Sequence, residues 1–432
     1  MSTSPPADPP VEPTTPDEEV RLLTEPRDGI PDVVDDGSAL AEAVDAVRSG
    51  RGPVAIDAER ASGYRYGQRA YLVQVRREGA GTWLIDPVPL EDLSGLGQAL
   101  DGTEWVLHAA TQDLPCLAEV GLRPSNLFDT ELGARLAGLP RVGLAAVVEH
   151  YLKVSLAKEH SAVDWSTRPL PEPWLRYAAL DVELLVELRE AVAEDLQQQG
   201  KLEWARQEFQ ALTSFTAQPP RPDPWRRISG MHRVRSRRVA ALVRELWEVR
   251  DRIARERDVS PGRVLPDATL IDLAMRAPRS ASALVGVVSA ETTRSRQRRA
   301  QQGLLRHQRQ WLAAIRTASA LDERDLPELT RRSEGPPPAR AWPDRDPVAA
   351  ARLARVRERL TVLSEELRVP VENLLTPDTM RRVLWDPPID ERGEVTEASV
   401  DAALAELGAR PWQRQLTVPV LTEALVEHPG TA

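Results

Sequence analysis

The stretch that decides the fold is Gly52-Pro-Val-Ala-Ile-Asp-Ala-Glu59, a short apolar run that ends in two acidic residues. The apolar part, Gly52–Ile56, predicts a buried strand of an α/β sheet, and residues two positions apart on a strand point to the same face. Asp57 and Glu59 should therefore project together at the end of that strand, where α/β sheets usually place their ligands. Asp-x-Glu after a strand is also common at turns, so these two carboxylates alone do not indicate a metal site.

A second acidic segment is His108-Ala-Ala-Thr-Gln-Asp-Leu114. Its Asp113 lies at or just before the start of a predicted helix over residues 114–120, which ends at Gly121. An aspartate at such a position can also serve as nothing more than a helix cap. His108 is either a catalytic helper or a supporting side chain, and the two alanines after it favour the supporting role because they indicate tight surroundings.

The third segment, Tyr177-Ala-Ala-Leu-Asp181, lies within residues 172–185, where apolar residues recur at intervals of three and four and predict a helix. Prolines stand at its start, where a missing N–H group costs little. Tyr177 and Asp181 lie four residues apart and therefore share one face of the helix. Each segment is common when it stands alone. Together, within one domain-sized stretch, the three predict a carboxylate cage for two divalent cations, the apparatus of phosphodiester hydrolysis.

These segments also carry a resemblance to a known family. The segments Asp57-Ala-Glu59 with Tyr71-Leu-Val-Gln-Val75, His108 with Gln112-Asp113-Leu114, and Tyr177-x-x-x-Asp181 resemble the first, second and third exonuclease motifs of ribonuclease D, the third in its tyrosine-containing form. Between the second and third motifs, Lys158–Leu170 resembles the Lys…Asp-Trp-Ser-x-Arg-Pro-Leu signature of that family. The match covers roughly residues 30 to 215. This chain has Ala58 where many relatives carry Thr and Gln112 where they carry Glu, and neither position is a metal ligand.

The resemblance implies roles for the site residues. Two Mg²⁺ or Mn²⁺ ions would be held by four carboxylates: Asp57, Glu59, Asp113 and Asp181. Tyr177 would orient the attacking water, since the ordinary pKa of a phenol, about 10, makes it a poor base at neutral pH. The resemblance further implies 3′→5′ polarity, release of nucleoside monophosphates, a preference for RNA, and trimming of the 3′ ends of tRNA precursors or other structured RNA.

Five further residues are candidates for substrate binding: His108, Gln112, Lys158, Trp165 and Arg168. The last three either contact the substrate backbone or brace a loop, and the sequence leaves both roles open.

Proline-rich segments divide the chain. We expect a disordered, acidic tail over 1–27, an exonuclease domain over 28–217, a linker over 218–225, a helical domain over 226–320, a second linker over 333–343 and a second helical domain over 344–432. Strand patterns are confined to the first domain.

The two helical domains share a sequence pattern. Val259–Leu270 aligns without gaps to Val369–Met380, and each follows an amphipathic helix rich in Arg and Glu, which indicates two copies of one unit. The first copy resembles the HRDC domain found in helicases and in ribonuclease D, and the second a diverged copy. We therefore predict a multidomain chain, in which an α/β, ribonuclease-H-like exonuclease domain with a mixed sheet covered by helices on both faces precedes two all-α HRDC-type bundles.

Composition narrows the class of protein. The single cysteine, Cys116, excludes an intramolecular disulfide framework and fits a reducing cytoplasm, and no secretory signal or membrane-spanning run is predicted. The formal net charge is −10, but arginines gather in two groups after the first domain. The groups are Arg226, Arg227, Arg233, Arg235, Arg237, Arg238 and Arg244, then Arg294, Arg296, Arg298, Arg299, Arg306 and Arg309. Each group is either a solvated face or a phosphate contact.

Two other functions share much of this pattern. A DNA-directed 3′→5′ exonuclease would use the same cage, but no polymerase or helicase segment follows a proline-rich break here. A catalytically silent RNA-binding adaptor would have lost part of the cage, whereas all four carboxylates and the tyrosine are present.

Overall fold

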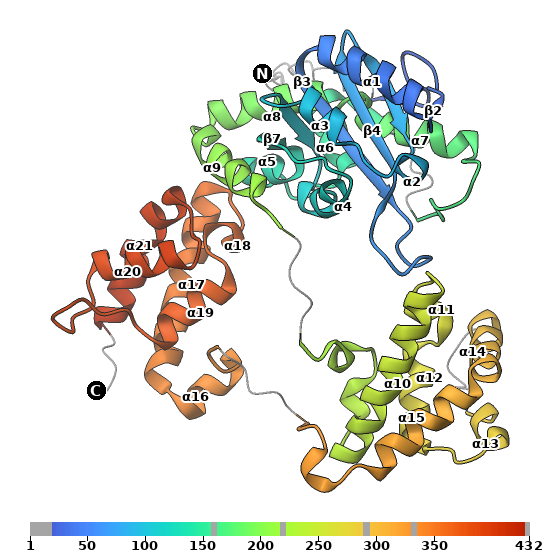
Figure 1. The fold of residues 1–432 in the computed structure, drawn as a ribbon. Helices are drawn as coiled ribbons and strands as arrows, with labels where there is room; N and C mark the ends of the chain where they lie inside the picture. Colours follow the sequence, from blue (N-terminus) through green and yellow to red (C-terminus); the bar gives the residue numbers. More distant parts are fainter. Residues whose placement is uncertain (1–19, 157–161, 217–221, 288–293, 330–334, 428–432) are drawn as a thin grey trace, which may run out of the picture.

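The computed structural model describes residues 20–156, 162–216, 222–287, 294–329 and 335–427. Three lobes follow one another along the chain: an α/β domain and two helical domains, with every described strand in the first (Figure 1). The predicted fold class is confirmed. Within the described ranges, no helix combines the length and the apolar composition needed to cross a bilayer.

A six-stranded mixed sheet organises the first lobe. Its order is β2 (Val33–Val34), β5 (Gly81–Ile85), β4 (Ala70–Glu78), β3 (Arg51–Arg60), β6 (Glu104–Leu107) and β7 (Asn126–Asp129). Strand β4 is antiparallel to both neighbours, and the other pairs are parallel. A separate parallel pair joins β1 (Arg21–Leu23) to β8 (Val154–Leu156). Strand β1 lies inside the segment predicted as a disordered tail, so the folded chain begins before residue 28.

Strand β3 is longer than the sequence predicted. We expected it to end at Ile56, but it pairs with β4 as far as Arg60, so that Asp57 and Glu59 lie within the strand and not beyond its end. The pairing supplies the reason, because β4 offers backbone partners along the whole of this segment. The predicted orientation holds, since two residues in the same strand at this spacing share one face.

Helices cover both faces of the sheet. On one face, Leu72 packs with Ala178 and Ala179 of α7 (Glu172–Glu183). The other face carries Val73 and Val75, which belong to a larger core with α1 (Gly37–Ser49) and α3 (Ser94–Ala99). The remaining helices of the lobe are α2 (Pro87–Leu90), η1 (Ala110–Gln112), α4 (Leu114–Glu119), α5 (Thr130–Ala137), α6 (Leu144–Leu152), α8 (Leu185–Gln198) and α9 (Leu202–Thr213).

The second lobe is a helical bundle. It contains η2 (Pro224–Arg227), η3 (Met231–Arg233), α10 (Arg237–Glu256), α11 (Pro261–Val264), α12 (Asp267–Arg276), α13 (Ala281–Val285), α14 (Arg294–Arg306), α15 (Gln308–Ala320) and η4 (Glu323–Asp325). Its core holds the fully buried Trp311, and it includes Trp225 from the segment expected as a linker and Leu326 beyond the expected end.

The third lobe repeats the start of the second. It contains η5 (Ala339–Ala341), α16 (Trp342–Arg345), α17 (Pro347–Leu367), α18 (Val371–Leu374), α19 (Pro377–Trp385), α20 (Glu397–Glu406) and α21 (Pro411–Glu427). The gapless alignment places the first residues of α11 and α12 on the first residues of α18 and α19, so the two aligned segments begin their helices at matching positions. Its core also holds Trp342, from the second expected linker.

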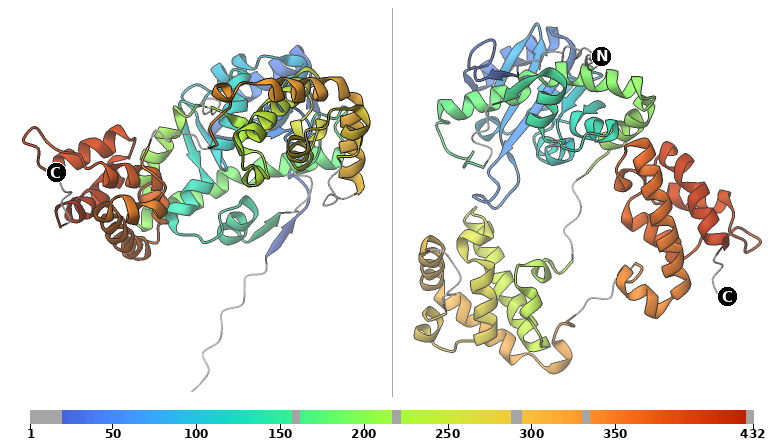
Figure 2. Two further views of the ribbon diagram at one scale, coloured as in Figure 1. Left: turned by 90° about the horizontal axis from the view of Figure 1, so that it is seen from below. Right: turned by 180° about the vertical axis from the view of Figure 1, so that it is seen from behind.

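The first lobe contacts each helical lobe at a separate place (Figure 2). The loop between β3 and β4 bonds to the second lobe: Ser260 donates its backbone N–H to the Tyr64 carbonyl at 3.0 Å, and the Tyr66 hydroxyl lies 3.0 Å from an Asp251 carboxylate oxygen. At the other contact, Trp412 of α21 stacks on Trp204 of α9 with ring centroids 5.0 Å apart.

Candidate active site

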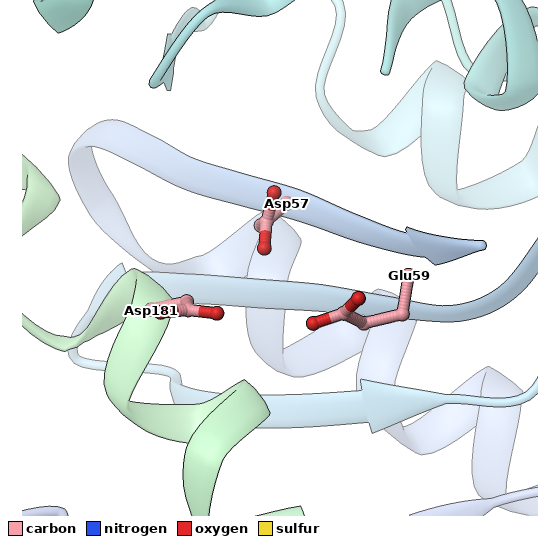
Figure 3. Close-up of side chains that lie close together, drawn as sticks. All are labelled: Asp57, Glu59 and Asp181. Carbon is pink, nitrogen blue, oxygen red and sulfur yellow. The ribbon is translucent and has the colours of Figure 1, made fainter. Parts of the chain in front are cut away.

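Three carboxylates from two distant segments meet on the face of the sheet that α7 covers. Asp57 and Glu59 come from β3 and Asp181 from α7, and one ligand oxygen of each lies within 4.8 Å of the others. Figure 3 shows the three side chains directed into the same space. The helix that carries Asp181 begins after Pro171 as the sequence predicted. The spacing on each element and the packing of α7 on the sheet thus create the cluster.

Asp113 joins this group from the turn between η1 and α4. Its side chain is buried, with 5% of the residue exposed, and it makes no hydrogen bond that caps α4. The role of a simple helix cap therefore does not describe it. Its carboxylate lies 3.8 Å from the Arg60 guanidinium, and its charge acts on Glu59. Asp113 therefore borders the cluster, although the three oxygens that lie within 4.8 Å of one another are those of Asp57, Glu59 and Asp181.

Burial raises the pKa of all four acids. Burial raises the pKa of Asp57 and of Asp181 above the ordinary value, and the charge of Asp57 raises the pKa of Asp181 further. Burial followed by repulsion from neighbouring carboxylates raises the pKa of Glu59 and of Asp113 well above their usual range. Arg60 opposes the rise at Asp57, Glu59 and Asp113, but one guanidinium does not balance four carboxylates. Such a group is stabilised by a bound cation.

Tyr177 lies one turn before Asp181, and the two side chains are hydrogen-bonded. Burial, and then the charges of Asp181 and Glu59, raise the pKa of the Tyr177 phenol, so it remains protonated at neutral pH. It can therefore donate or accept a hydrogen bond, but it is no base. The Tyr177 ring packs near the ring of Trp165, with ring centroids 6.3 Å apart.

A buried amide lies beside Asp57 and was not predicted. Gln74 pairs directly with Asp57 across β3 and β4, so both side chains point to the same face. Gln74 is 0% exposed, yet neither its side-chain nitrogen nor its oxygen has a hydrogen-bond partner. An unpaired buried amide is costly. Its place beside four carboxylates fits a site whose ligand completes the polar contacts, and the all-oxygen donor set fits a divalent cation such as Mg²⁺ or Mn²⁺.

Asp129 is a second residue that the sequence analysis missed. It caps α5 by accepting the backbone N–H groups of Glu131 and Leu132, and it also accepts those of Ala109 at 3.0 Å and Ala110 at 2.9 Å. Ala109 has a φ of 61°, which is unusual for a residue with a side chain. Asp129 thus fixes the turn that places Asp113. An acidic residue directly before a helical run was the available signal.

Two of the predicted substrate contacts lie near this turn. His108 places its Nδ1 atom 2.9 Å from the Thr130 hydroxyl, and burial lowers its pKa to about 4, so its ring is neutral at pH 7. These contacts favour the supporting role. Gln112, in contrast, is exposed directly before Asp113.

The loop before α7 holds two more of the predicted contacts. Arg168 makes a bidentate ion pair with Asp86, at 2.5 and 2.8 Å, and donates to three backbone carbonyls, those of Tyr71, Trp165 and Thr167. All of its donors are thereby used within the fold. Trp165 is 0% exposed. These contacts favour the bracing role for both residues. Lys158 lies outside the described residues.

Family comparisons match each lobe separately. A model described as "3'-5' exonuclease" matches residues 31–197, one described as "HRDC domain" matches 239–300, and one described as "3' to 5' exonuclease C-terminal domain" matches 335–425. The third lobe, which we predicted as a diverged HRDC copy, thus has a family description of its own while keeping the repeated helices.

Comparisons with whole proteins extend over most of the chain. Ribonuclease D from Gluconacetobacter diazotrophicus is 31% identical over 67% of this chain and 72% of its own length, and ribonuclease D from Cronobacter turicensis is 31% identical over 67% and 76%. The crystal structure of a protein from Bifidobacterium adolescentis is 38% identical, with a TM-score of 0.83 over 94% of this chain and 100% of its own. That of Escherichia coli RNase D, described as an exoribonuclease involved in structured RNA processing, is 27% identical, with a TM-score of 0.64 over 92% and 99%.

Proposed function

This chain belongs to the ribonuclease D family and is a 3′→5′ exoribonuclease, and from that premise we propose that it trims the 3′ ends of structured RNA, tRNA precursors among them, with two bound divalent cations. The observation that carries the proposal is the convergence of Asp57, Glu59 and Asp181 within 4.8 Å, with Asp113 beside them. The RNase D of E. coli, which resembles this chain along nearly its whole length, supports the substrate class.

The four carboxylates would bind the cations. Asp57, Glu59 and Asp181, whose oxygens lie within 4.8 Å of one another, would hold one cation, and Asp113, which the charge of Asp57 reaches, would help to hold the second. When bound, such cations supply a hydroxide nucleophile at neutral pH and neutralise charge on the leaving oxygen. Gln74 would hold the Asp57 carboxylate in a fixed orientation by donating from its buried amide.

Tyr177 would orient the attacking water through its hydroxyl group. Its raised pKa keeps the proton in place, and its contacts with Asp181 and Trp165 hold the phenol at the edge of the carboxylate cluster. Gln112, exposed beside Asp113, would contact the terminal nucleotide. The helical lobes would hold the body of the RNA while its 3′ end enters the site.

The test uses end-labelled RNA and DNA of the same sequence, each with the wild-type protein, with Asp181→Asn and with Tyr177→Phe. We expect RNA to shorten from its 3′ end in Mg²⁺ or Mn²⁺. EDTA or Asp181→Asn should abolish the reaction. Tyr177→Phe should lower kcat about 100-fold, because the hydroxyl group that orients the attacking water is lost.

Asp45→Asn is the matched control. Asp45 is an exposed aspartate whose ion pair with Arg48 lies on the surface of α1, so its loss should leave the rate unchanged. Equal turnover of DNA would replace the RNA assignment by a DNA-directed exonuclease. RNA binding without turnover in any metal would identify a silent adaptor and overturn the proposal.

A further inference from the structure

The two arginine groups of the second lobe are used differently. Five arginines of the first group pair with acidic side chains of the same lobe: Arg226 with Asp223, Arg233 with Asp272, Arg237 with Glu328, Arg238 with Glu323 and Arg244 with Glu245. These pairs explain five of the seven arginines in the first group as part of the fold. The second group gives a different picture, because Arg299 and Arg306 line a cavity.

This cavity, which we call the arginine pocket, lies between α11 and α14. It has a volume of about 250 Å³ and is lined by Arg257, Val259, Arg263, Val264, Arg299, Gln302, Gly303 and Arg306. No acidic side chain belongs to this lining. A side chain at Gly303 would meet the Val264 carbonyl, so the bare backbone lets the two helices approach and form the floor. The pocket is smaller than sites for drug-sized molecules, which measure about 300–1,000 Å³.

The charge of the arginine pocket is not compensated. Among the described residues, none of its four arginines forms an ion pair with an acidic side chain. Arg263 donates its Nε to the Gly63 carbonyl at 2.8 Å, and its terminal nitrogens have no acceptor in the described part of the chain. The positive charges also act on His307, the residue after Arg306. Burial is the main cause that lowers the pKa of His307, and the charges of Arg257 and Arg306 lower it further.

One wall of the pocket is attached to the catalytic domain. Arg263 lies over the Tyr64 ring, 4.1 Å from its centroid, and the Ser260 hydroxyl donates to the Gly63 carbonyl at 2.9 Å. Gly63 and Tyr64 belong to the loop that follows β3, the strand of Asp57 and Glu59. The pocket and the candidate active site are thus connected by a single short loop.

We propose that the arginine pocket binds a backbone phosphate of the RNA substrate, upstream of the nucleotide that occupies the active site. The proposal rests on the proposed function and deepens it. Four guanidinium groups around a small cavity suit a phosphate group, because arginine offers paired N–H donors that match phosphate oxygens. Contacts of this kind position a nucleic acid without reading its sequence.

The test compares two double variants of the full chain. Arg299→Ala/Arg306→Ala removes two of the four arginines that line the pocket, both from α14. Arg298→Ala/Arg309→Ala removes two exposed arginines outside the pocket, one from α14 and one from the next helix, α15. The charge change is equal, and all four side chains are exposed, so both proteins should fold. The probe is a fluorescein-labelled RNA hairpin with single-stranded 3′ tails of graded length, and its binding is measured by anisotropy in EDTA over a range of salt concentrations.

We expect the pocket variant to bind the long-tailed hairpin about 10-fold more weakly. Its plot of log affinity against log salt should be shallower by roughly 0.7, the contribution of one lost phosphate contact on a single strand. The control variant should resemble wild type. If both variants lose the same affinity for the hairpin, the positive charge of the lobe attracts RNA without a specific site, and the proposal of a phosphate-binding pocket is wrong. Equal affinity of the pocket variant and wild type would overturn it too.

Two further measurements separate related outcomes. Both variants should hydrolyse a dinucleotide at the wild-type rate, so a failure of the pocket is distinct from a failure of the exonuclease assignment. Inorganic phosphate, compared with chloride at equal ionic strength, should weaken hairpin binding by wild type more than by the pocket variant. Stabilisation of wild type by phosphate without any such competition would assign the pocket to the free ion and overturn the RNA proposal.

Discussion

Four carboxyl groups at the candidate site share a space in which burial and mutual repulsion raise their pKa values. A carboxyl group with a folded pKa above its unfolded value binds more protons in the folded state. The free energy of unfolding therefore falls as pH rises from the ordinary carboxyl range through the raised pKa. Metal-free protein should lose stability on going from mildly acidic to neutral pH, and bound cations should restore it.

The measurement that tests this prediction is the difference in melting temperature between the wild-type protein and Asp181→Asn. In EDTA, the melting temperature of wild type should rise relative to that of Asp181→Asn as pH is lowered from neutral toward the ordinary carboxyl range. Saturating Mn²⁺ should raise the melting temperature of wild type, since binding at 100 times Kd contributes about 2.7 kcal/mol, and should raise that of the variant less. A pH-independent difference in EDTA would contradict the coupled site.

Gln74 allows a second prediction, for Gln74→Met. Replacing an unpaired buried amide by an apolar side chain of similar length should raise the free energy of unfolding in EDTA by about 1 kcal/mol. If the amide orients Asp57, Mn²⁺ affinity measured by calorimetry should fall about 10-fold. Gln98→Met, at an exposed position of α3, is the control. Greater stability with unchanged Mn²⁺ affinity would reduce Gln74 to a packing residue.

The sequence could predict the candidate ligands because each lies in a local pattern of strand or helix. It could not predict that Gln74 lies beside Asp57, or that Asp129 accepts hydrogen bonds from the turn before Asp113. Gln74 stands opposite Asp57 only through the register of β3 and β4, and Asp129 meets Ala109 only because β6 and β7 lie side by side. Both contacts depend on how distant strands pair, and the spacing of residues within one segment gives no information about that pairing.

At the scale of elements, the loop before α7 is held by one arginine. Arg168→Met should lower the free energy of unfolding by about 2–3 kcal/mol, because Asp86 would stay buried without its ion pair. Denaturation by urea measures the change, and Arg48→Met, which breaks an exposed pair on α1, should cost less than about 1 kcal/mol.

A double-mutant cycle with Asp86→Asn completes this prediction. The two single changes should be strongly non-additive, because each removes the same pair. Additive losses would show that the backbone contacts of Arg168, and not its pairing with Asp86, hold the loop.

Most of the elements predicted from the sequence were recognised by the spacing of apolar residues along helices. The elements that were not predicted depend on partner strands that lie far away in the sequence. The repeat in the helical lobes could be recognised in the sequence because Val259–Leu270 and Val369–Met380 align without gaps. The extension of β3 and the short strand β1 could not be recognised in this way, since each depends on a distant partner: β4 for one and β8 for the other. Arg168 and Trp165 had two possible roles in the sequence, and the bracing role is favoured by the hydrogen bonds of Arg168 and by the burial of Trp165, both of which depend on distant segments.

At the scale of the whole molecule, the first and third lobes share one core. Val369, Leu374 and Trp412 belong to the same buried cluster as Phe209 of α9, and the Trp412 indole donates to Glu208 at 2.9 Å. The two lobes should therefore unfold together. The second lobe is joined to the first mainly by polar contacts of the β3–β4 loop, which would leave it more freedom of movement.

Trp412→Ala tests this difference. The loss of a buried tryptophan should cost about 3–5 kcal/mol and should lower the temperature at which hydrolysis of a short RNA oligomer is lost. Trp385→Ala, which removes a ring that packs on Trp342 inside the third lobe, should leave that temperature closer to wild type. If the two variants inactivate at the same temperature, the shared core does not support the catalytic domain.

The stacking of α21 on α9 has a consequence for the order in which the protein is made. Trp204 leaves the ribosome roughly 200 residues before Trp412, an interval of about 10–40 seconds at 5–20 residues per second. During that time the nascent catalytic domain displays an uncovered aromatic surface to chaperones and to neighbouring chains. Synthesis of the last helix ends this exposure, so premature termination should yield an aggregation-prone fragment in place of a smaller nuclease.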